Sequence, residues 1–386
     1  YHSSVIMSAA AARRKKQLLA RKKQQEAAEG AEDAVAAQLK KLLEDESLGE
    51  EATAYEALQL AQSQVRKKVH AGEFKAAVEL SYKASLAILK KGRVSVASQL
   101  LTVLANVLRE THTEETEEIL EWISELNKAH HSAMEGMANG LEAQRLYKLQ
   151  RDWLRRCVQW SAELGPMRFG RMQLQELLAE QCWKLSKLIE KENEEDELME
   201  LKTDAVTHMA LAEKPETIVQ WLKELPKPTE AETKTGHLCA PADRDALLTR
   251  AVLCFAAVEN LRDANTLVRS FLEKVEERKS DELTKSYVSK DDGKAPSHII
   301  FCCMLIRTCE KDPRTGPLFN WLLRSFKREL DMLYKPQIVQ SYTTKIGKIY
   351  FNIQPPPSMM NMLENMMGMM GGGGGAGGMN PAMMQA

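Results

Sequence analysis

Proline and glycine are sparse over most of this sequence of 386 residues, which contains 13 prolines and 20 glycines. The glycines gather most densely near the carboxyl terminus, and long stretches elsewhere contain neither residue. Both residues disfavour the interior of a helix, whereas the turns that connect strands depend on them. The distribution therefore favours long helices and argues against a sheet.

An excess of one charge and long apolar runs are absent as well. Lys and Arg number 53 and Asp and Glu 54, so the net charge is −1 and no global field attracts nucleic acid. No uncharged run approaches the roughly 18 apolar residues of a membrane-spanning helix. Basic residues within 13–16 and 21–23 interrupt any signal-peptide core, and acids between 26 and 33 argue against a transit peptide. We expect a cytosolic protein without stable membrane insertion, with Met7 a candidate initiator.

Local motifs for catalysis are also lacking. No phosphate loop of the type G-x-x-x-x-G-K-[ST] and no H-E-x-x-H zinc motif occur. His298 and Cys302 stand four residues apart, with Cys303 and Cys309 nearby, but they alternate with apolar residues in a run typical of a buried helix. The odd number of cysteines, seven, favours free thiols in a reducing compartment. We predict no catalytic residue, no metal and no cofactor, and hence a protein that is not an enzyme.

The sequence instead predicts a long series of consecutive amphipathic helices. From about Thr53, apolar residues recur at helical spacing in one segment that ends near Gly72 and in a second that ends near Gly92. Further helices are predicted at about residues 94–108, 113–126, 132–164, 169–189, 195–211, 215–225, 243–258, 263–276, 298–309, 317–333 and 336–351.

Short turns between these helices force neighbours to lie antiparallel. A single pair cannot bury its apolar face alone, so successive pairs stack. The predicted fold class is therefore all-α, an α-solenoid of stacked antiparallel helix pairs that forms a tetratricopeptide-like superhelix, although the strict tetratricopeptide signature is absent. A collapsed globular bundle is the alternative.

Changes in composition divide the chain into predicted parts. Residues 1–45 form a charged helical or disordered lead-in, 46–226 an amino-terminal helical-repeat half, 227–241 a linker loop, 242–354 a carboxyl-terminal helical-repeat half, and 355–386 a tail rich in Met and Gly. A second polar interruption at 279–296 is long for a compact train, and we expect it to be functional, with a short hairpin near Tyr287.

The tail is predicted to be disordered and of low complexity. Its methionines allow a second interpretation, transient contact with hydrophobic client helices, because flexible thioether side chains fit irregular apolar surfaces.

Several segments together resemble the Golgi-to-ER traffic protein four family, the 35-kilodalton subunit of the transmembrane-domain recognition complex. The segment from Tyr55 through Gly72-Glu-Phe-Lys-Ala-Ala-Val-Glu-Leu80 is similar to the first helix pairs of that family. Arg156-Cys-Val-Gln-Trp160 is similar to its middle, and Arg250-Ala-Val-Leu-Cys-Phe255 to its carboxyl half. The end resembles it most: Pro317-Leu-Phe-Asn, then Lys345-Ile-Gly-Lys-Ile-Tyr350-Phe351, leading to Gln354-Pro-Pro-Pro357.

The resemblance implies a cytosolic scaffold that bridges a co-chaperone to the targeting ATPase for post-translational delivery of tail-anchored membrane proteins to the ER. It implies three partners: the ATPase at the amino-terminal half, a ubiquitin-like-domain protein at the other half, and in some lineages a BAG-domain chaperone. Carried over, the ATPase contact comprises Tyr55, Gln59, Arg66, Lys67, Lys68 and Glu73. The ubiquitin-like contact comprises Leu283, Tyr287 and Val288 with the helices that hold Phe301, Phe319 and Trp321.

Two other functions fit a helical train. A general tetratricopeptide-like co-chaperone would bind chaperone tails through basic clamps on its concave face, but the basic clusters, at 13–16, 21–23 and 66–68, lie towards the amino terminus. A subunit of a large regulatory particle, such as the proteasome lid, would have a winged-helix carboxyl end, whereas residues 336–351 are predicted to be helical. The basic clusters also lack the interleaved aromatics of a single-stranded nucleic-acid site.

Overall fold

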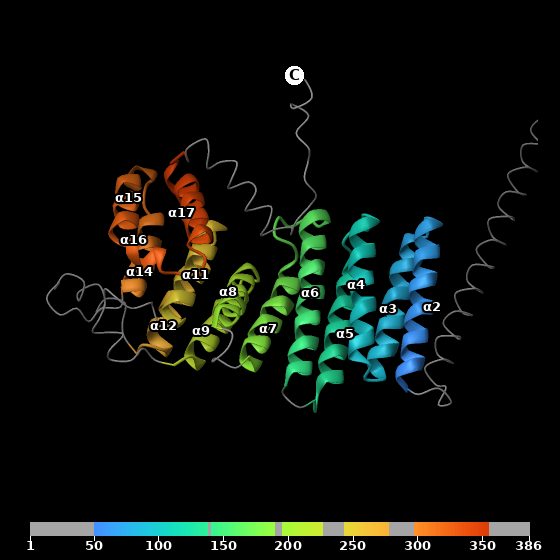
Figure 1. Cartoon of the computed structure of the whole chain (residues 1–386). Coiled ribbons are helices and arrows are strands. Elements are labelled where there is room, and N and C mark those ends of the chain that lie inside the picture. The colour runs from blue at the N-terminus through green and yellow to red at the C-terminus, as the bar shows by residue number, and fades with distance from the viewer. Residues whose placement is uncertain (1–49, 138–139, 190–194, 227–242, 278–296, 355–386) are drawn as a thin grey trace, which may run out of the picture. The chain divides into compact units, whose positions relative to one another are not determined.

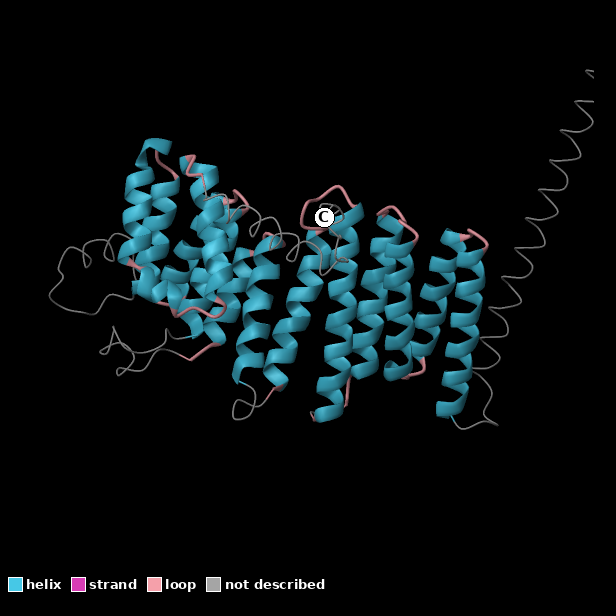
Figure 2. Ribbon diagram, turned by 45° about the horizontal axis from the view of Figure 1, so that its top comes forward, coloured by secondary structure: helices cyan, strands magenta, loops and turns pink. Residues whose placement is uncertain are grey.

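Helices make up nearly all of the part of the protein that the computed structural model describes, which is residues 50–137, 140–189, 195–226, 243–277 and 297–354. Within these ranges there is no strand (Figure 2). The α-helices are α2 (Glu50–His70), α3 (Phe74–Lys90), α4 (Val94–Glu110), α5 (Glu117–Met134), α6 (Leu141–Leu164), α7 (Met172–Leu188), α8 (Glu195–Leu211), α9 (Pro215–Glu224), α11 (Asp243–Ala257), α12 (Leu261–Lys274), α14 (Ser297–Cys309), α15 (Gly316–Ser325), α16 (Lys327–Asp331) and α17 (Pro336–Phe351), with a 3-10 turn η1 (Pro313–Thr315) before α15.

The described residues fall into two compact units. Unit 1 contains the residues up to Thr113 together with Glu121–Gly136, and unit 2 contains Glu114–Leu120 and the residues from Met137 onward. The division therefore falls within α5, inside the predicted amino-terminal half.

Glycines in the left-handed conformation join the first helices of unit 1. Gly72 (φ +76°) follows α2, and Gly92 (φ +71°) follows α3. At each turn the glycine and the next residue donate to carbonyls of the preceding helix, as in Glu73 N to Lys68 O (2.9 Å) and Arg93 N to Ile88 O (3.3 Å). Such a turn reverses the chain within a few residues, so α3 packs antiparallel to α2 before it and to α4 after it (Figure 1).

The core of unit 1 is the shared apolar face of these helices. Small residues allow close approach: Ala57 and Ala61 of α2 and Ala77 of α3 have no exposed surface. Leucines of α4 fill the space beyond them, with Leu100 and Leu101 fully buried. This is the predicted pattern of helix pairs, in which neither member of a pair buries its apolar face alone.

Unit 2 repeats the arrangement with larger side chains. Helix α7 packs on α6 and α8, α8 on α11, and α11 on α12, α14 and α17. Trp153 and Trp160 of α6 are buried, and Trp183 of α7 stacks on Trp221 of α9 with ring centroids 4.8 Å apart. Helix α11 is buried on nearly all sides, because helices cover it on several faces. An all-α fold of stacked helix pairs is thus confirmed.

Three predicted boundaries differ from the structure. The helix expected from Thr113 begins at Glu117, because the hydroxyl of Thr116 accepts from the backbone N–H of Ile119 and caps it. The segment 132–164 is broken between Met134 and Leu141, next to Gly136. The segment 317–333 is two helices, since α15 ends at Ser325 and α16 begins at Lys327. The predicted hairpin near Tyr287, the lead-in 1–45, the linker 227–241 and the tail lie outside the described residues.

Candidate partner-binding surfaces

The outer face of α2 carries four of the residues predicted to bind the ATPase. Tyr55, Gln59 and Arg66 are separated by four and seven residues, so they lie on one side of the helix, and all three are exposed. The ring of Tyr55 is 42% exposed, which is unusual for so large a side chain. Lys67 is also exposed, next to Arg66. We call these four residues the α2 face; it has a ring at one end and two cations at the other.

The other two predicted ATPase contacts bind each other. Lys68 Nζ lies 3.3 Å from a carboxylate oxygen of Glu73, so an ion pair spans the turn between α2 and α3. Phe74, the next residue, is 42% exposed and extends the apolar part of this surface. Phe74 is not among the residues that the sequence predicted for this contact.

A second surface feature of unit 1 was also missed. Tyr82 of α3 stacks on Trp122 of α5 with ring centroids 4.8 Å apart and planes 8° from parallel. The Tyr82 hydroxyl donates to the carboxylate of Glu125, and burial, together with this carboxylate, raises the pKa of Tyr82 to about 12. Both rings are only partly buried, so they form a rigid aromatic surface between two helices.

The residues predicted for the ubiquitin-like partner are placed in three different ways. Leu283, Tyr287 and Val288 lie outside the described residues. Phe301 of α14 and Phe319 of α15 are each 1% exposed, and they support their helices from inside.

Among the members of this set that the structure describes, Trp321 of α15 is the one that faces outward. It is 46% exposed, and Leu318, one turn earlier on the same face, is 45% exposed. We call Leu318 and Trp321 the α15 strip. Beneath the strip, Phe319 stacks on Phe351 of α17 with ring centroids 4.7 Å apart. The strip is thus an apolar surface on a helix fixed from below by aromatic packing.

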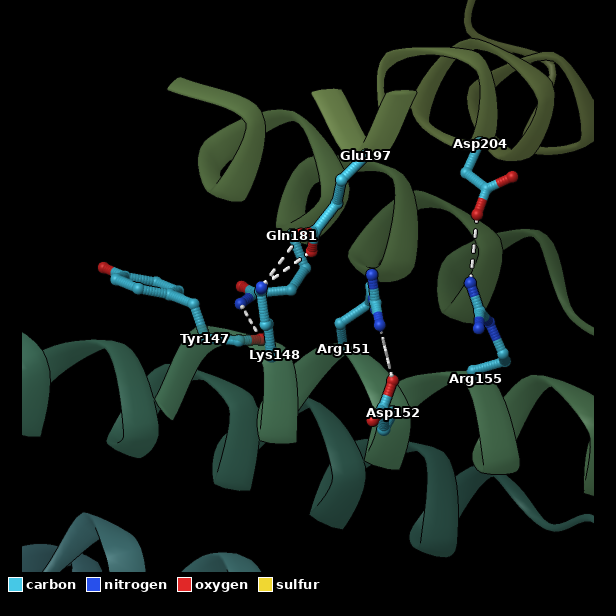
Figure 3. A network of polar contacts seen from close by, with 8 residues as sticks. All are labelled: Tyr147, Lys148, Arg151, Asp152, Arg155, Gln181, Glu197 and Asp204. Atoms are coloured by element: carbon cyan, nitrogen blue, oxygen red, sulfur yellow. Dashed lines mark hydrogen bonds and ion pairs between the residues drawn. The ribbon is translucent and has the colours of Figure 1, made fainter. Parts of the chain in front are cut away.

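A basic row on α6 tests the alternative of a clamp for acidic chaperone tails. Lys148, Arg151 and Arg155 recur at helical spacing and point toward α8 (Figure 3). Lys148 pairs with Glu197 at 2.8 Å and Arg155 with Asp204 at 3.0 Å.

The remaining cation of this row is neutralised locally. Arg151 pairs with the adjacent Asp152 at 3.0 Å, and its side chain is mostly buried. Gln181 of α7 donates to the backbone carbonyl of Tyr147 at 3.0 Å and ties α6 to α7 beneath the row. Each of these three cations already has its carboxylate within the protein, so the row stabilises the packing of three helices and is not a preformed anion clamp.

A buried carboxylate fixes the turn between α6 and α7. Glu115, whose side chain is 1% exposed, accepts hydrogen bonds from Ser161 Oγ and from Arg171 Nε, the latter at 2.6 Å. Ser161 Oγ in turn accepts from the backbone N–H of Arg171 at 2.8 Å. Gly165 leaves room for the carboxylate, because an added Cβ would lie 2.5 Å from Glu115 Oε2. We call Glu115, Ser161 and Arg171 the Glu115 clasp.

His298, Cys302 and Cys309, which could suggest a metal, belong to the core, and Cys303 is partly buried. His298 lies 3.3 Å from the hydroxyl of Thr249, and Cys302 contacts the same hydroxyl. Burial lowers the pKa of His298 to about 4 and raises that of the Cys302 thiol, so both are neutral at pH 7. No group of three or more metal-binding side chains occurs among the described residues, and no helix there is long and apolar enough to cross a membrane.

The protein is a helical-repeat protein, because it is built of paired helices that carry separate polar and apolar surfaces. The family model for Golgi to ER traffic protein 4 matches residues 71–370, so the chain belongs to that family. It is 23% identical over 322 residues to Protein GET4 of Arabidopsis thaliana, which covers 79% of this chain and 87% of the plant protein.

A solved structure supports the fold independently. The crystal structure of C. therm. Get4 superimposes with a TM-score of 0.52 at 17% sequence identity, over 92% of this chain and 99% of that one. The family resemblance drawn from short sequence segments is therefore confirmed. Membership assigns the protein to the Golgi-to-ER traffic pathway, in which helical-repeat proteins of this family act through protein–protein contacts.

Proposed function

We propose that the protein is a cytosolic scaffold with two binding surfaces. The α2 face binds the ATPase that targets tail-anchored membrane proteins to the ER, and the surface around α15 binds a ubiquitin-like-domain protein, with a BAG-domain chaperone as a further partner. Holding both partners at once allows a client to pass to the ATPase. The observation that carries the proposal is family membership over residues 71–370, together with two exposed surfaces of different chemistry in different compact units.

The chemistry of the α2 face suits a fast, salt-sensitive contact. Arg66 and Lys67 are exposed near the carboxyl end of α2 and have positive charge available for an acidic patch on a partner. Rim charges of this kind mainly raise the association rate, and salt screens them. Tyr55 adds an aromatic anchor with few rotatable bonds, which loses little entropy when it is buried.

The α15 strip suits a tighter, more apolar contact. Trp321 and Leu318 present carbon surface on a helix whose other side is held by buried aromatic rings. Tryptophan is the residue type most often found where truncation weakens an interface strongly. Salt should affect this contact less than the contact at the α2 face.

The test measures the affinity of the full chain for each partner by biolayer interferometry. Reversing two charges, Arg66→Glu with Lys67→Glu, should weaken ATPase binding roughly tenfold, mostly through the association rate, and leave the ubiquitin-like partner unaffected. Lys68 is left unchanged, because its ion pair with Glu73 belongs to the turn. Trp321→Ala should show the reverse selectivity.

A matched control separates a specific contact from a general change of charge. Lys90 and Lys91 are exposed at the carboxyl end of α3, in the same unit, and their reversal to Glu changes the net charge equally. That variant should bind the ATPase as the unchanged protein does. Equal weakening by both double variants, or loss of both partners from either, would contradict the assignment of the α2 face.

A further inference from the structure

The α15 strip is an apolar surface that no described residue covers. Helix α15 turns Phe319 and Leu322 into the core, while Leu318 and Trp321 are each close to half exposed one turn apart. Together they form contiguous apolar surface that contains a tryptophan, a residue type enriched where binding energy concentrates.

The described chain ends beside this helix. Helix α17 ends at Phe351; the next residue, Asn352, adopts the left-handed conformation (φ +53°), and Ile353 N donates to Gly347 O at 3.0 Å. The side chain of Ile353 then lies against Gly316, the first residue of α15, where its Cδ1 is 3.8 Å from the position of an added Cβ. At about 100° per residue Gly316 lies on the side of α15 opposite Leu318 and Trp321, so the described chain ends near the first turn of α15, across the helix from the strip.

The sequence that follows has an apolar face of matching length. At about 100° per residue, all methionines and the leucine of residues 359–370 fall on one side of a helix. The polar side holds Asn361, Glu364, Asn365 and Gly368. Ser358 precedes this segment, as a helix N-cap residue would, and follows three prolines, a residue type that favours extended backbone.

The spacer is also long enough. From Gln354 to Met359 an extended chain reaches about 16 Å, at about 3.3 Å per residue. This exceeds the diameter of a helix with its side chains, about 10–12 Å, so the chain can pass from one side of α15 to the other. Thioether side chains adapt to irregular surfaces and make favourable contacts with aromatic rings.

We propose that residues 359–370 dock on the α15 strip of the same chain as an amphipathic helix, with methionines against Trp321 and Leu318. Docking of a tethered segment needs only weak contacts, because the short spacer keeps its local concentration high. One consequence rests on the proposed function: the docked segment competes with the ubiquitin-like partner for the strip, so that partner must displace it.

The test compares three full-length proteins by hydrogen–deuterium exchange of residues 316–325. The first is unchanged, and the second carries Met359→Ser, Met366→Ser and Met370→Ser at the centre of the apolar face. The third is the matched control, with Met379→Ser, Met383→Ser and Met384→Ser beyond the glycine run. If the segment docks, residues 316–325 of α15 should exchange at least threefold faster in the second protein than in the unchanged one. In the third protein they should exchange at the unchanged rate. The circular dichroism of all three proteins should be the same.

Equal exchange in all three proteins would overturn the proposal, since the strip would then be open in the unchanged chain. Protection that increases with protein concentration would also overturn it, because a second copy would then be the occupant. The competition is measured separately: the second protein should bind the ubiquitin-like partner at least twofold more tightly than the third. If exchange changes but this affinity does not, docking stands and the shared surface of the proposed function fails.

Discussion

The Glu115 clasp leads to the most specific prediction for stability. Glu115→Gln removes a charge from a carboxylate that is 1% exposed and accepts from Ser161 and Arg171. Hydrogen bonds to a buried charge contribute about 1.5–3 kcal/mol, and Arg171, itself 31% exposed, regains some hydration when the pair is lost. We therefore expect a loss of about 2 kcal/mol in the free energy of unfolding. For a unit of this size that lowers the midpoint of thermal unfolding by about 4–8 °C.

The same arginine supplies a matched control. Glu117 also pairs with Arg171, but its side chain is 74% exposed. Exposed ion pairs contribute little, so Glu117→Gln should cost less than about 0.5 kcal/mol and lower the midpoint by less than about 2 °C. Thermal unfolding of both variants, followed by circular dichroism at pH 7 in one buffer, measures the difference. Equal shifts for the two variants would refute the argument that burial gives the clasp its strength.

Three further predictions follow from single positions. Gly170→Ala should destabilise the protein by about 2 kcal/mol in urea unfolding, because the φ of Gly170 is +78° and an added Cβ would lie 2.9 Å from a backbone carbonyl of α6. Gly72 has a similar φ but open space around it, so Gly72→Ala should cost only about 1 kcal/mol. Burial lowers the pKa of His298 from 6.5 to about 4, so the contribution of the neutral ring to the free energy of unfolding is intact above pH 6.5. That contribution is lost as pH falls towards 4, by about 1.4 kcal/mol per pH unit. The free energy of unfolding, measured across this range, should therefore decline less steeply for His298→Gln than for the unchanged protein. Iodoacetamide should modify Cys303 at least tenfold faster than its fully buried neighbour Cys302 under native conditions, as peptide mass spectrometry would show; similar rates would contradict the placement of α14.

Features encoded locally were predictable from the sequence. Gly72 and Gly92 end amphipathic segments, and a positive φ at each is what turns α2 into α3 and α3 into α4. The spacing of apolar residues then places Leu100 and Leu101 inside. The missed cap at Thr116 was also local: Thr113 and Thr116 both precede the helix, and the choice between them depends on the fold of the whole turn.

The surfaces were harder to predict, because exposure depends on which helices meet. Phe319 and Trp321 are two residues apart and both aromatic, yet one is in the core and the other is half exposed. Composition does not distinguish them; the packing of α17 against α15 does. The contact of Glu115 with Arg171 joins residues 56 positions apart, and no local pattern indicates it.

The central claim, that one chain holds two partners on separate surfaces, is tested most directly by the mass of the complex in solution. The full chain, the targeting ATPase and the ubiquitin-like-domain protein are mixed and analysed by size-exclusion chromatography with light scattering. We predict one peak whose mass requires all three proteins. The complex should lose only the ATPase when the chain carries Arg66→Glu with Lys67→Glu, and only the ubiquitin-like protein when it carries Trp321→Ala. Two binary complexes in place of the ternary one would contradict the claim, because each partner would then exclude the other.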